Sequence, residues 1–204
     1  MLKIWGRTNS VNVKKALWAL EELGVKYQRV DAGMQYGVVQ TPEYKKMNPN
    51  SLVPTIEDDG FVLWESHSIV RYLAAKHGAS SLWPNDLRVR ADADRWMDWA
   101  LTFQASFRTV FWGLVRTPPE KRDMNAIEAA RKKCAELLAI PDAALQGRQY
   151  LAGNFSMGDI PLGCHVQLWM RLPIERLALP NLQAWFDRLC GRPAFRKIVD
   201  IPLS

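Results

Sequence analysis

The sequence predicts a two-part chain in which a small α/β domain is followed by an all-helical domain. Strand-like and helix-like patterns alternate over residues 1–79, whereas strand-like alternation almost vanishes from residue 86 onward. The 204 residues, of which 48% are hydrophobic, can bury at most two small cores. We therefore expect one domain at residues 1–79 and a second at residues 86–204.

The opening segment is predicted to form a strand, a helix and a second strand. Leu2 to Trp5 is a short apolar run, and Val25 to Val30 is a second one. Between them, apolar residues recur with helical spacing and a glycine follows as a natural stop; these are Val13, Ala16, Leu17, Leu20, Leu23 and Gly24. So compact an arrangement implies a parallel strand pair with a crossover helix.

The next segment is predicted to add a short helix, a hairpin and a longer helix. Pro42 to Met47 has the pattern of the short helix. Val53 to Glu57 and Phe61 to Trp64 are short runs joined by Asp58-Asp59-Gly60, which is typical of an antiparallel hairpin. Ser66 to His77 is amphipathic with helical spacing. This βαβ-ββα order is the thioredoxin-type arrangement of a four-stranded mixed sheet.

After a linker at Gly78 to Asn85, the second domain is predicted to be helical, with its helices broken by prolines that include Pro141, Pro180 and Pro193. One long helix carries an aromatic stripe, which consists of Trp96, Trp99, Phe103, Phe107 and Phe111. Core packing explains the stripe, and its upper end is also a candidate wall of an apolar substrate pocket. Beside that end, Arg108 is a candidate for holding a substrate carboxylate, although a surface role explains it too.

Composition argues against several functional classes. The chain shows neither a signal peptide nor an apolar run long enough to span a membrane, so we expect a cytoplasmic protein. Cys134, Cys164 and Cys190 are isolated, and no cysteine or histidine has ligand-like spacing, so neither disulfides nor a metal is expected. The net charge of +6 comes from scattered residues, which favours a small anionic ligand over nucleic acid.

Three places in the first domain are candidates for chemistry. Ser10 lies where the first helix begins, and a hydroxyl there favours a thiolate, although an ordinary helix cap explains it as well. Val53 precedes Pro54, where an exposed backbone can pair with an extended peptide. Glu65 and Ser66 open a helix and suit an amino-acid head group, although helix capping explains each separately.

With these three places, the sequence resembles the cytosolic glutathione transferases, and the resemblance covers essentially the whole chain. It is carried by Ser10 with the following Val-Asn-Val-Lys-Lys-Ala-Leu, by Met47 to Pro54, by Glu65-Ser66 with Ile69 to Leu73, and by Ser156 to Asp159. The last of these resembles the family's capping box in the second domain. Within the family the sequence is most similar to the bacterial theta-like group, some of whose members displace halide from haloacids such as bromoacetate.

The resemblance implies that glutathione is the co-substrate and that its thiolate is added to small electrophiles. It further implies a cis peptide bond before Pro54, with the Val53 backbone holding the cysteinyl part of glutathione. Glu65 and Ser66 are expected at the γ-glutamyl end. The loop that ends at Gln40 is expected at the glycyl carboxylate.

Several alternatives remain open within the resemblance. Ser10 aligns with the serine that activates the thiol, but Thr8, Asn9 and Asn12 crowd the same place and are alternative donors. Family members that use threonine and asparagine there often work as disulfide reductases, so a glutathione-dependent reductase or peroxidase is the rival enzyme. A non-catalytic ligand carrier is the rival outside the enzymes. The resemblance also implies a homodimer.

Overall fold

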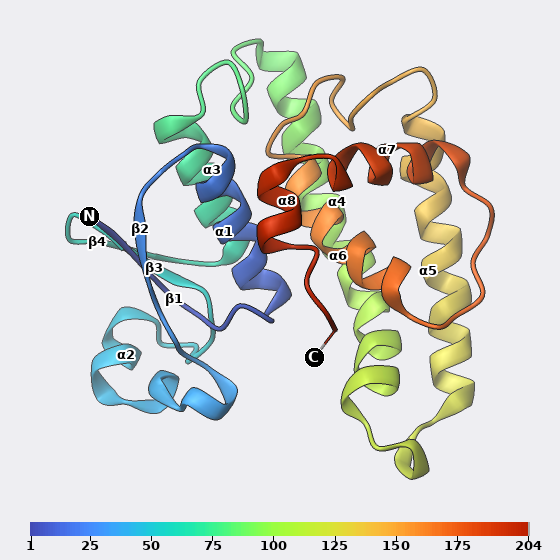
Figure 1. The fold of residues 1–204 in the computed structure, drawn as a ribbon, viewed down its shortest axis with the longest axis horizontal. Coiled ribbons are helices and arrows are strands. Elements are labelled where there is room, and N and C mark those ends of the chain that lie inside the picture. Colours follow the sequence, from blue (N-terminus) through green and yellow to red (C-terminus); the bar gives the residue numbers. More distant parts are fainter. Residues whose placement is uncertain (204) are drawn as a thin grey trace.

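The computed structural model describes residues 1–203 and shows an α/β part followed by helices (Figure 1). The α/β part comprises β1 (Leu2–Trp5), α1 (Val11–Glu22), β2 (Tyr27–Val30), the 3-10 turns η1 (Met34–Tyr36) and η2 (Val38–Gln40), α2 (Pro42–Met47), β3 (Thr55–Asp58), β4 (Phe61–Trp64) and α3 (Ser66–His77). The predicted fold class, a thioredoxin-like half followed by a helical half, is confirmed.

The four strands form one mixed sheet in the order β2-β1-β3-β4. β1 runs parallel to β2 and antiparallel to β3, where Ile4 lies opposite Ile56 in the buried centre. β3 and β4 form the predicted hairpin, and its turn holds Asp59 and Gly60 at positive φ values of 49° and 85°. Such angles are the ones that tight hairpin turns require.

Two strands begin two residues later than predicted, at Tyr27 and at Thr55. The backbone N–H of Val25 donates to the Leu20 carbonyl and so closes the end of α1. Pro54 has no N–H to contribute to the sheet. The first two residues of each predicted strand therefore lie outside the hydrogen-bonded sheet.

The helical part comprises α4 (Leu87–Phe111), η3 (Trp112–Arg116), η4 (Pro119–Lys121), α5 (Met124–Ala144), α6 (Asp159–Arg171), α7 (Pro180–Cys190) and α8 (Pro193–Ile198). Pro180 and Pro193 begin helices, where the missing N–H costs nothing. The predicted break at Pro141 is wrong, because α5 continues to Ala144. Only about one turn of α5 follows Pro141, so little of the helix depends on the backbone hydrogen bond that the proline cannot form.

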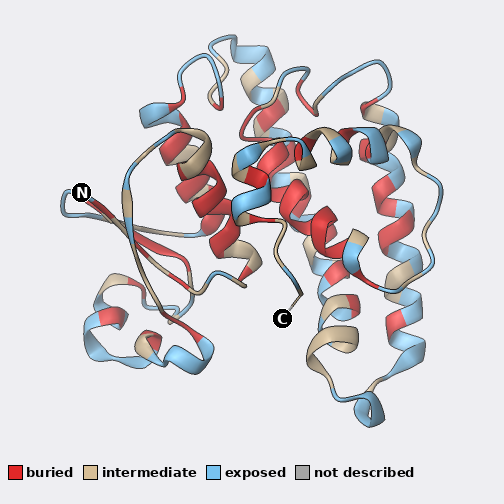
Figure 2. Cartoon of the chain, viewed as in Figure 1, coloured by how far each residue is buried: buried red, intermediate tan, exposed pale blue. Residues whose placement is uncertain are grey.

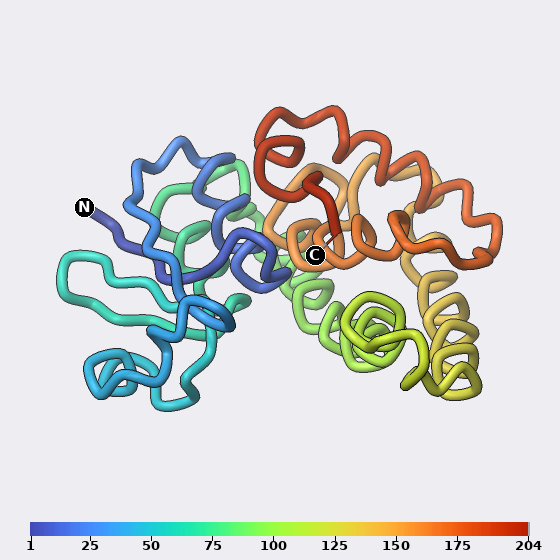
Figure 3. The backbone as a smooth tube through the Cα atoms, turned by 60° about the horizontal axis from the view of Figure 1, so that its bottom comes forward, coloured from blue at the N-terminus to red at the C-terminus, as the bar shows by residue number. Residues whose placement is uncertain are grey.

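The core runs through both parts of the chain, and α1 lies near its centre (Figure 2). This helix packs against α3 in the α/β part and against α6 and α8 in the helical part. The Arg192 guanidinium donates two hydrogen bonds of 2.7 Å to the Glu22 carboxylate, and Lys14 Nζ donates to the Val199 carbonyl at 3.0 Å. Figure 3 shows the C-terminal segment at the boundary between the two parts.

Just before α6 the structure forms one of the two bonds of the predicted capping box, the one that Asp159 returns, whereas the Ser156 hydroxyl bonds the Gly158 N–H instead of the Asp159 N–H. The Ser156 N–H donates to Asp159 Oδ2 at 3.0 Å, and the Gly158 N–H donates to the Ser156 hydroxyl at 3.3 Å. Asp159 Oδ1 accepts two more hydrogen bonds, from the Leu151 N–H at 3.0 Å and from Trp185 Nε1 at 2.9 Å. Burial raises the pKa of Asp159 to about 6, so these donors are what hold a carboxylate in the interior.

Candidate functional site

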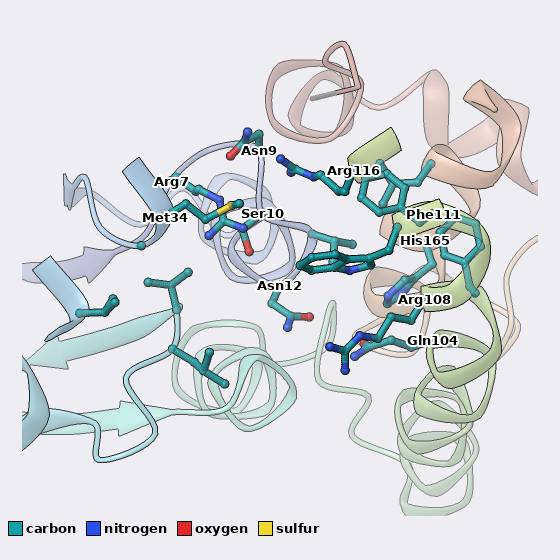
Figure 4. A pocket seen from close by; sticks show the side chains of 18 of the residues that line it. Arg7, Asn9, Ser10, Asn12, Met34, Gln104, Arg108, Phe111, Arg116 and His165 are labelled. Atoms are coloured by element: carbon teal, nitrogen blue, oxygen red, sulfur yellow. The ribbon is translucent and has the colours of Figure 1, made fainter. Parts of the chain in front are cut away.

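A cavity of about 490 Å³ lies between the start of α1 and the C-terminal half of α4 (Figure 4). The first wall comes from the α/β part and includes Arg7, Asn9, Ser10, Val11, Asn12, Gly33, Met34, Val39, Ser51, Leu52 and Val53. The second wall comes from the helical part and includes Gln104, Phe107, Arg108, Phe111, Trp112, Arg116, His165 and Leu168. A cleft of this size that joins two structural parts is a typical small-molecule site.

Ser10 occupies the N-cap position of α1, with φ −82° and ψ 123°, but its side chain makes no capping hydrogen bond. Its backbone is engaged, because its N–H donates to the Arg7 carbonyl at 3.3 Å and its carbonyl accepts from Lys14 at 2.9 Å. Ser10 is therefore the N-cap residue by position, as predicted, but its hydroxyl does not cap the helix. The hydroxyl lines the cavity beside the positive end of the α1 dipole, an arrangement suited to an anion.

The peptide bond between Val53 and Pro54 is cis, as expected, and Val53 lines the cavity. The preceding carbonyl, that of Leu52, accepts hydrogen bonds from the Tyr44 hydroxyl at 2.6 Å and from Asn48 Nδ2 at 3.0 Å. The Val53 backbone forms no hydrogen bond with any described residue. An extended ligand therefore finds a firmly held backbone segment with a free donor and a free acceptor.

Glu65 and Ser66 lie at the start of α3, directly after β4. Ser66 is buried, whereas Glu65 is exposed and adopts a positive φ of 72°. A non-glycine residue in this backbone region costs free energy, and such residues cluster at binding sites. The side chain of Glu65 makes no capping hydrogen bond to α3.

The second wall of the cavity is the end of the aromatic stripe on α4. Trp96 and Phe103 are buried in the core, while Phe107 and Phe111 line the cavity with ring centroids 6.0 Å apart. Both interpretations of the stripe therefore apply to different parts of it. Arg108 is an exposed residue that also lines the cavity, and its guanidinium lies 5.6 Å from the ring centre of Trp112.

Three arginines line the cavity, namely Arg7, Arg108 and Arg116, and none of the described lining residues is an aspartate or a glutamate. Burial lowers the pKa of the Arg7 guanidinium, and the positive charge of Arg116 on the opposite wall lowers it further. Positive charges that meet across a cavity without a neighbouring carboxylate are typical of a site that receives an anion.

Comparison with known proteins identifies the family. Residues 1–75 match the glutathione S-transferase N-terminal domain, and residues 103–193 match the C-terminal domain. Glutathione S-transferase GstB of Escherichia coli is 44% identical, with 100% of both chains covered. Maize glutathione S-transferase 4 is 32% identical, over 97% of this chain and 91% of the relative.

A solved structure agrees with these matches. The theta-class glutathione S-transferase of the citrus canker pathogen Xanthomonas axonopodis pv. citri, with glutathione bound, superimposes with a TM-score of 0.96 at 51% identity, covering 100% of this chain and 99% of that one. The chain belongs to the glutathione S-transferase family.

In this transferase, six predicted site residues line this cavity together: Ser10, Asn12, Val53, Phe107, Arg108 and Phe111. Of the described residues, four others that were predicted do not line it, namely Gln40, Pro54, Glu65 and Ser66. Gln40 is exposed at the end of η2, and Pro54 is buried. Their roles in binding stay predictions.

Sequence reasoning missed other residues that line the cavity of the transferase. Gln104 has the helical spacing of Phe107 and Phe111, so this signal was available. Arg7 lies in the segment before α1, where the hydroxyl and amide donors, rather than the charge, carried the prediction. Arg116 and His165 come from distant elements, and no local pattern brings them to the site.

No group of three or more histidine, cysteine, aspartate or glutamate side chains within residues 1–203 has an arrangement that could hold a metal ion. None of the described helices of the transferase is long and apolar enough to cross a membrane.

Proposed function

We propose that this transferase binds glutathione in the cavity, activates its thiol as a thiolate and adds it to small electrophiles. The observation that carries the proposal is the uncapped Ser10 hydroxyl facing a cavity whose opposite wall is Phe107 and Phe111. Residues 1–79 would form the glutathione-binding domain, and residues 86–204 would supply the electrophile pocket.

Each part of glutathione has a proposed partner. The Val53 backbone would pair with the cysteinyl residue, which is supported by its free donor and acceptor. Glu65 and the start of α3 would hold the ammonium and carboxylate of the γ-glutamyl end. Gln40 would hold the glycyl carboxylate. The thiol would then lie near Ser10 and Asn12 at the start of α1.

The reaction requires no covalent enzyme intermediate. The thiol proton leaves to solvent, and the thiolate attacks the carbon of the electrophile. With a haloacid, a carbon–sulfur bond forms as the carbon–halogen bond breaks, and halide departs with the bonding electrons. Ser10 and the N-terminal end of α1 would stabilise the thiolate before attack.

The test is a pH titration of bound glutathione, followed by thiolate absorbance, for the native protein and for Ser10→Ala and Asn12→Ala. We expect a thiol pKa well below the ordinary value of about 8.5, and a rise of about one unit or more in the variant that removes the true donor. Ser106→Ala, on α4 and outside the cavity lining, serves as the control and should leave the pKa unchanged.

Other outcomes would identify the rival functions. If the thiol of bound glutathione has its ordinary pKa and no electrophile is turned over, the transferase proposal is rejected and a ligand carrier takes its place. Rapid reduction of mixed disulfides with little conjugation would favour the reductase. Absence of glutathione binding would reject the site as a whole.

We further propose that the preferred electrophiles are anionic, with haloacids as the leading class. The support is the set of arginines in the cavity, where burial and then the charge of Arg116 lower the pKa of Arg7, so that an anion bound between them would be favoured. Glutathione carries carboxylates that could take one guanidinium, and the second wall still offers Arg108 and Arg116 to the electrophile.

Bromoacetate and bromoacetamide have nearly the same shape, so they separate charge recognition from reactivity. We expect kcat/KM for bromoacetate, corrected for the uncatalysed rates, to exceed that for bromoacetamide by about tenfold, which corresponds to about 1.4 kcal/mol. Arg116→Met or Arg108→Met should reduce this preference. Equal preference in all three proteins would show that the arginines do not select the electrophile.

We also propose a cytoplasmic homodimer. Its support is that Phe61 and Leu87, at opposite parts of the fold, are large apolar side chains with 50% and 70% of their surface exposed. The dimer would pack the α/β half of one subunit against the helical half of its partner. Light scattering would give the mass in solution, and a monomer of 23.3 kDa would contradict the proposal.

A further inference from the structure

Lys15 is a fully buried lysine in the second turn of α1, directly behind the cavity wall. Its Nζ lies 3.0 Å from Asn12 Oδ1, 3.0 Å from His67 Nε2 and 3.2 Å from Gln104 Oε1. These partners come from α1, α3 and α4, so one ammonium group joins both halves of the molecule. Burying such a charge is unfavourable unless each of its hydrogens finds an acceptor.

The chemistry of the ammonium group determines how its partners are oriented. It has three donors and no acceptor, so Asn12 and Gln104 must each present their amide oxygen to it. Their NH₂ groups then point away from Lys15. Both side chains line the cavity, Asn12 from the α/β part and Gln104 from the helical part (Figure 4).

The third partner, His67, is neutral. Burial lowers the pKa of His67 to about 3, and the charges of Lys15 and Arg71 act in the same direction. Its Nε2 is therefore free to accept a hydrogen bond from Lys15 at neutral pH. Burial also lowers the pKa of Lys15 to about 8, which leaves the ammonium form dominant at pH 7.

We propose that Lys15 is a positioning residue for the thiolate site. It directs the NH₂ groups of Asn12 and Gln104 into the cavity and places a buried positive charge behind them. The inference deepens the proposed function and rests on it, because the group that benefits is the sulfur of bound glutathione. Amide donors held ready in a partly buried site stabilise an anion without reorganising when it forms.

The neighbouring Lys14 shows that burial of a lysine in α1 does not by itself imply this role. Lys14 is 2% exposed, and its Nζ donates to the Val199 carbonyl at 3.0 Å. That contact fastens the C-terminal segment, and Lys14 does not line the cavity. The two adjacent lysines therefore provide a matched pair, in which one joins amides of the cavity wall and the other joins the chain terminus.

The experiment compares Lys15→Met with Lys14→Met by thiolate titration of bound glutathione and by steady-state kinetics across pH. For Lys15→Met we expect the thiol pKa to rise by about one unit and kcat at pH 6.5 to fall about tenfold. The rate should recover above the new thiol pKa, and KM for glutathione should change little. Lys14→Met should reduce thermal stability and leave the thiol pKa unchanged.

The pH profile must be assigned to sulfur rather than to groups that face Lys15. Those groups are His67 on α3, Cys164 and His165 on α6, and Glu65 before α3. Thiolate absorbance of bound glutathione reports on its sulfur directly. A protein without glutathione, scanned over the same pH range, corrects for the absorbance of Cys164 and the tyrosines.

Lys15→Met leaves buried acceptors without a donor, so a second pair of variants covers the case that it does not fold. Lys15→Met/Gln104→Met removes two partners together, which is the milder change, and is compared with Gln104→Met alone. The double variant should show the higher thiol pKa. Equal values in the two proteins would overturn the proposal.

The outcomes also separate this inference from the function on which it rests. If Ser10→Ala raises the thiol pKa and Lys15→Met does not, the thiolate mechanism stands and the role of Lys15 is rejected. If Lys14→Met and Lys15→Met shift the thiol pKa equally, the shift comes from the loss of a buried charge in general. That result also rejects the role of Lys15. A normal thiol pKa in the native protein would reject the thiolate mechanism itself.

Discussion

A serine lies shortly before α1 and another shortly before α6, and the two helix starts differ in where the local hydrogen bonds go. At α6, the Ser156 hydroxyl accepts from the Gly158 N–H, and the Asp159 carboxylate accepts from two backbone N–H groups and one indole. At α1, the Ser10 side chain makes no capping hydrogen bond and faces a cavity.

The difference separates a helix start that serves folding from one that serves a ligand. Every helix begins with backbone N–H groups that lack partners inside the helix. At α6 the protein satisfies such groups itself, in the buried core. At α1 the unsatisfied groups, the helix dipole and a hydroxyl are left beside a cavity, where an anion can complete them.

To test this comparison, we expect the largest loss of stability from Asp159→Ala. The substitution leaves three buried donors without an acceptor, which should reduce the free energy of unfolding by at least about 3 kcal/mol. Denaturant unfolding would measure the loss. The thiol pKa of glutathione bound to the surviving folded protein should not move.

Asp142→Ala is the control for Asp159. Asp142 accepts hydrogen bonds from the Leu182 N–H at 2.8 Å and from Asn181 Nδ2 at 3.4 Å, but it is only half-buried. Its loss should cost about 1 kcal/mol, because solvent can replace part of what is removed. Equal losses for the two aspartates would show that the α6 start is not a special centre of stability.

Acid pH should destabilise the region behind α1 through His67. Its pKa is about 3 in the folded protein and about 6.5 when unfolded, so between these values the unfolded state binds a proton that the folded state does not. Stability from this source is complete above pH 6.5 and is lost as the pH falls. From pH 7 to pH 5 the loss should be about 2 kcal/mol.

The measurement is the difference between the stability curves of the native protein and of His67→Gln, in which the amide oxygen can still accept from Lys15. The difference isolates His67, since Asp159 titrates with the opposite sign: its pKa of about 6 makes the folded state bind a proton more readily as the pH falls. Parallel curves for the two proteins would contradict the assignment to His67.

The smallest effects are expected from the same substitution at the two serines. Ser156→Ala removes a capping acceptor in the core and should cost about 1 kcal/mol of stability. Ser10→Ala removes no capping hydrogen bond, so its cost should stay within about 0.5 kcal/mol. Thermal unfolding would compare them, and a larger loss for Ser10→Ala would mean that its hydroxyl serves folding after all.

Much of the fold was predictable because it follows from local patterns. The apolar spacing in α1 and the Asp58-Asp59-Gly60 turn appear as expected, and so does the cis bond before Pro54, which the family resemblance implied rather than a local pattern. Where prediction went wrong, the start of β2 was decided by the hydrogen bond of Val25, the start of β3 by the N–H that Pro54 lacks, and the end of α5 by the position of Pro141 one turn before it. Element ends depend on such single contacts, whereas element types depend on many residues together.

By itself, the sequence determined the fold class, the bond from the Ser156 N–H to Asp159 before α6, and the placing of Ser10, Val53 and Phe107 in the regions that line the cavity. The tertiary structure alone decided that Arg7 and Arg116 face each other and that Lys15 joins Asn12, His67 and Gln104. Periodicity tells which face of a helix is buried, but a long polar side chain takes its partners from elements far away in the chain, and only packing brings those together.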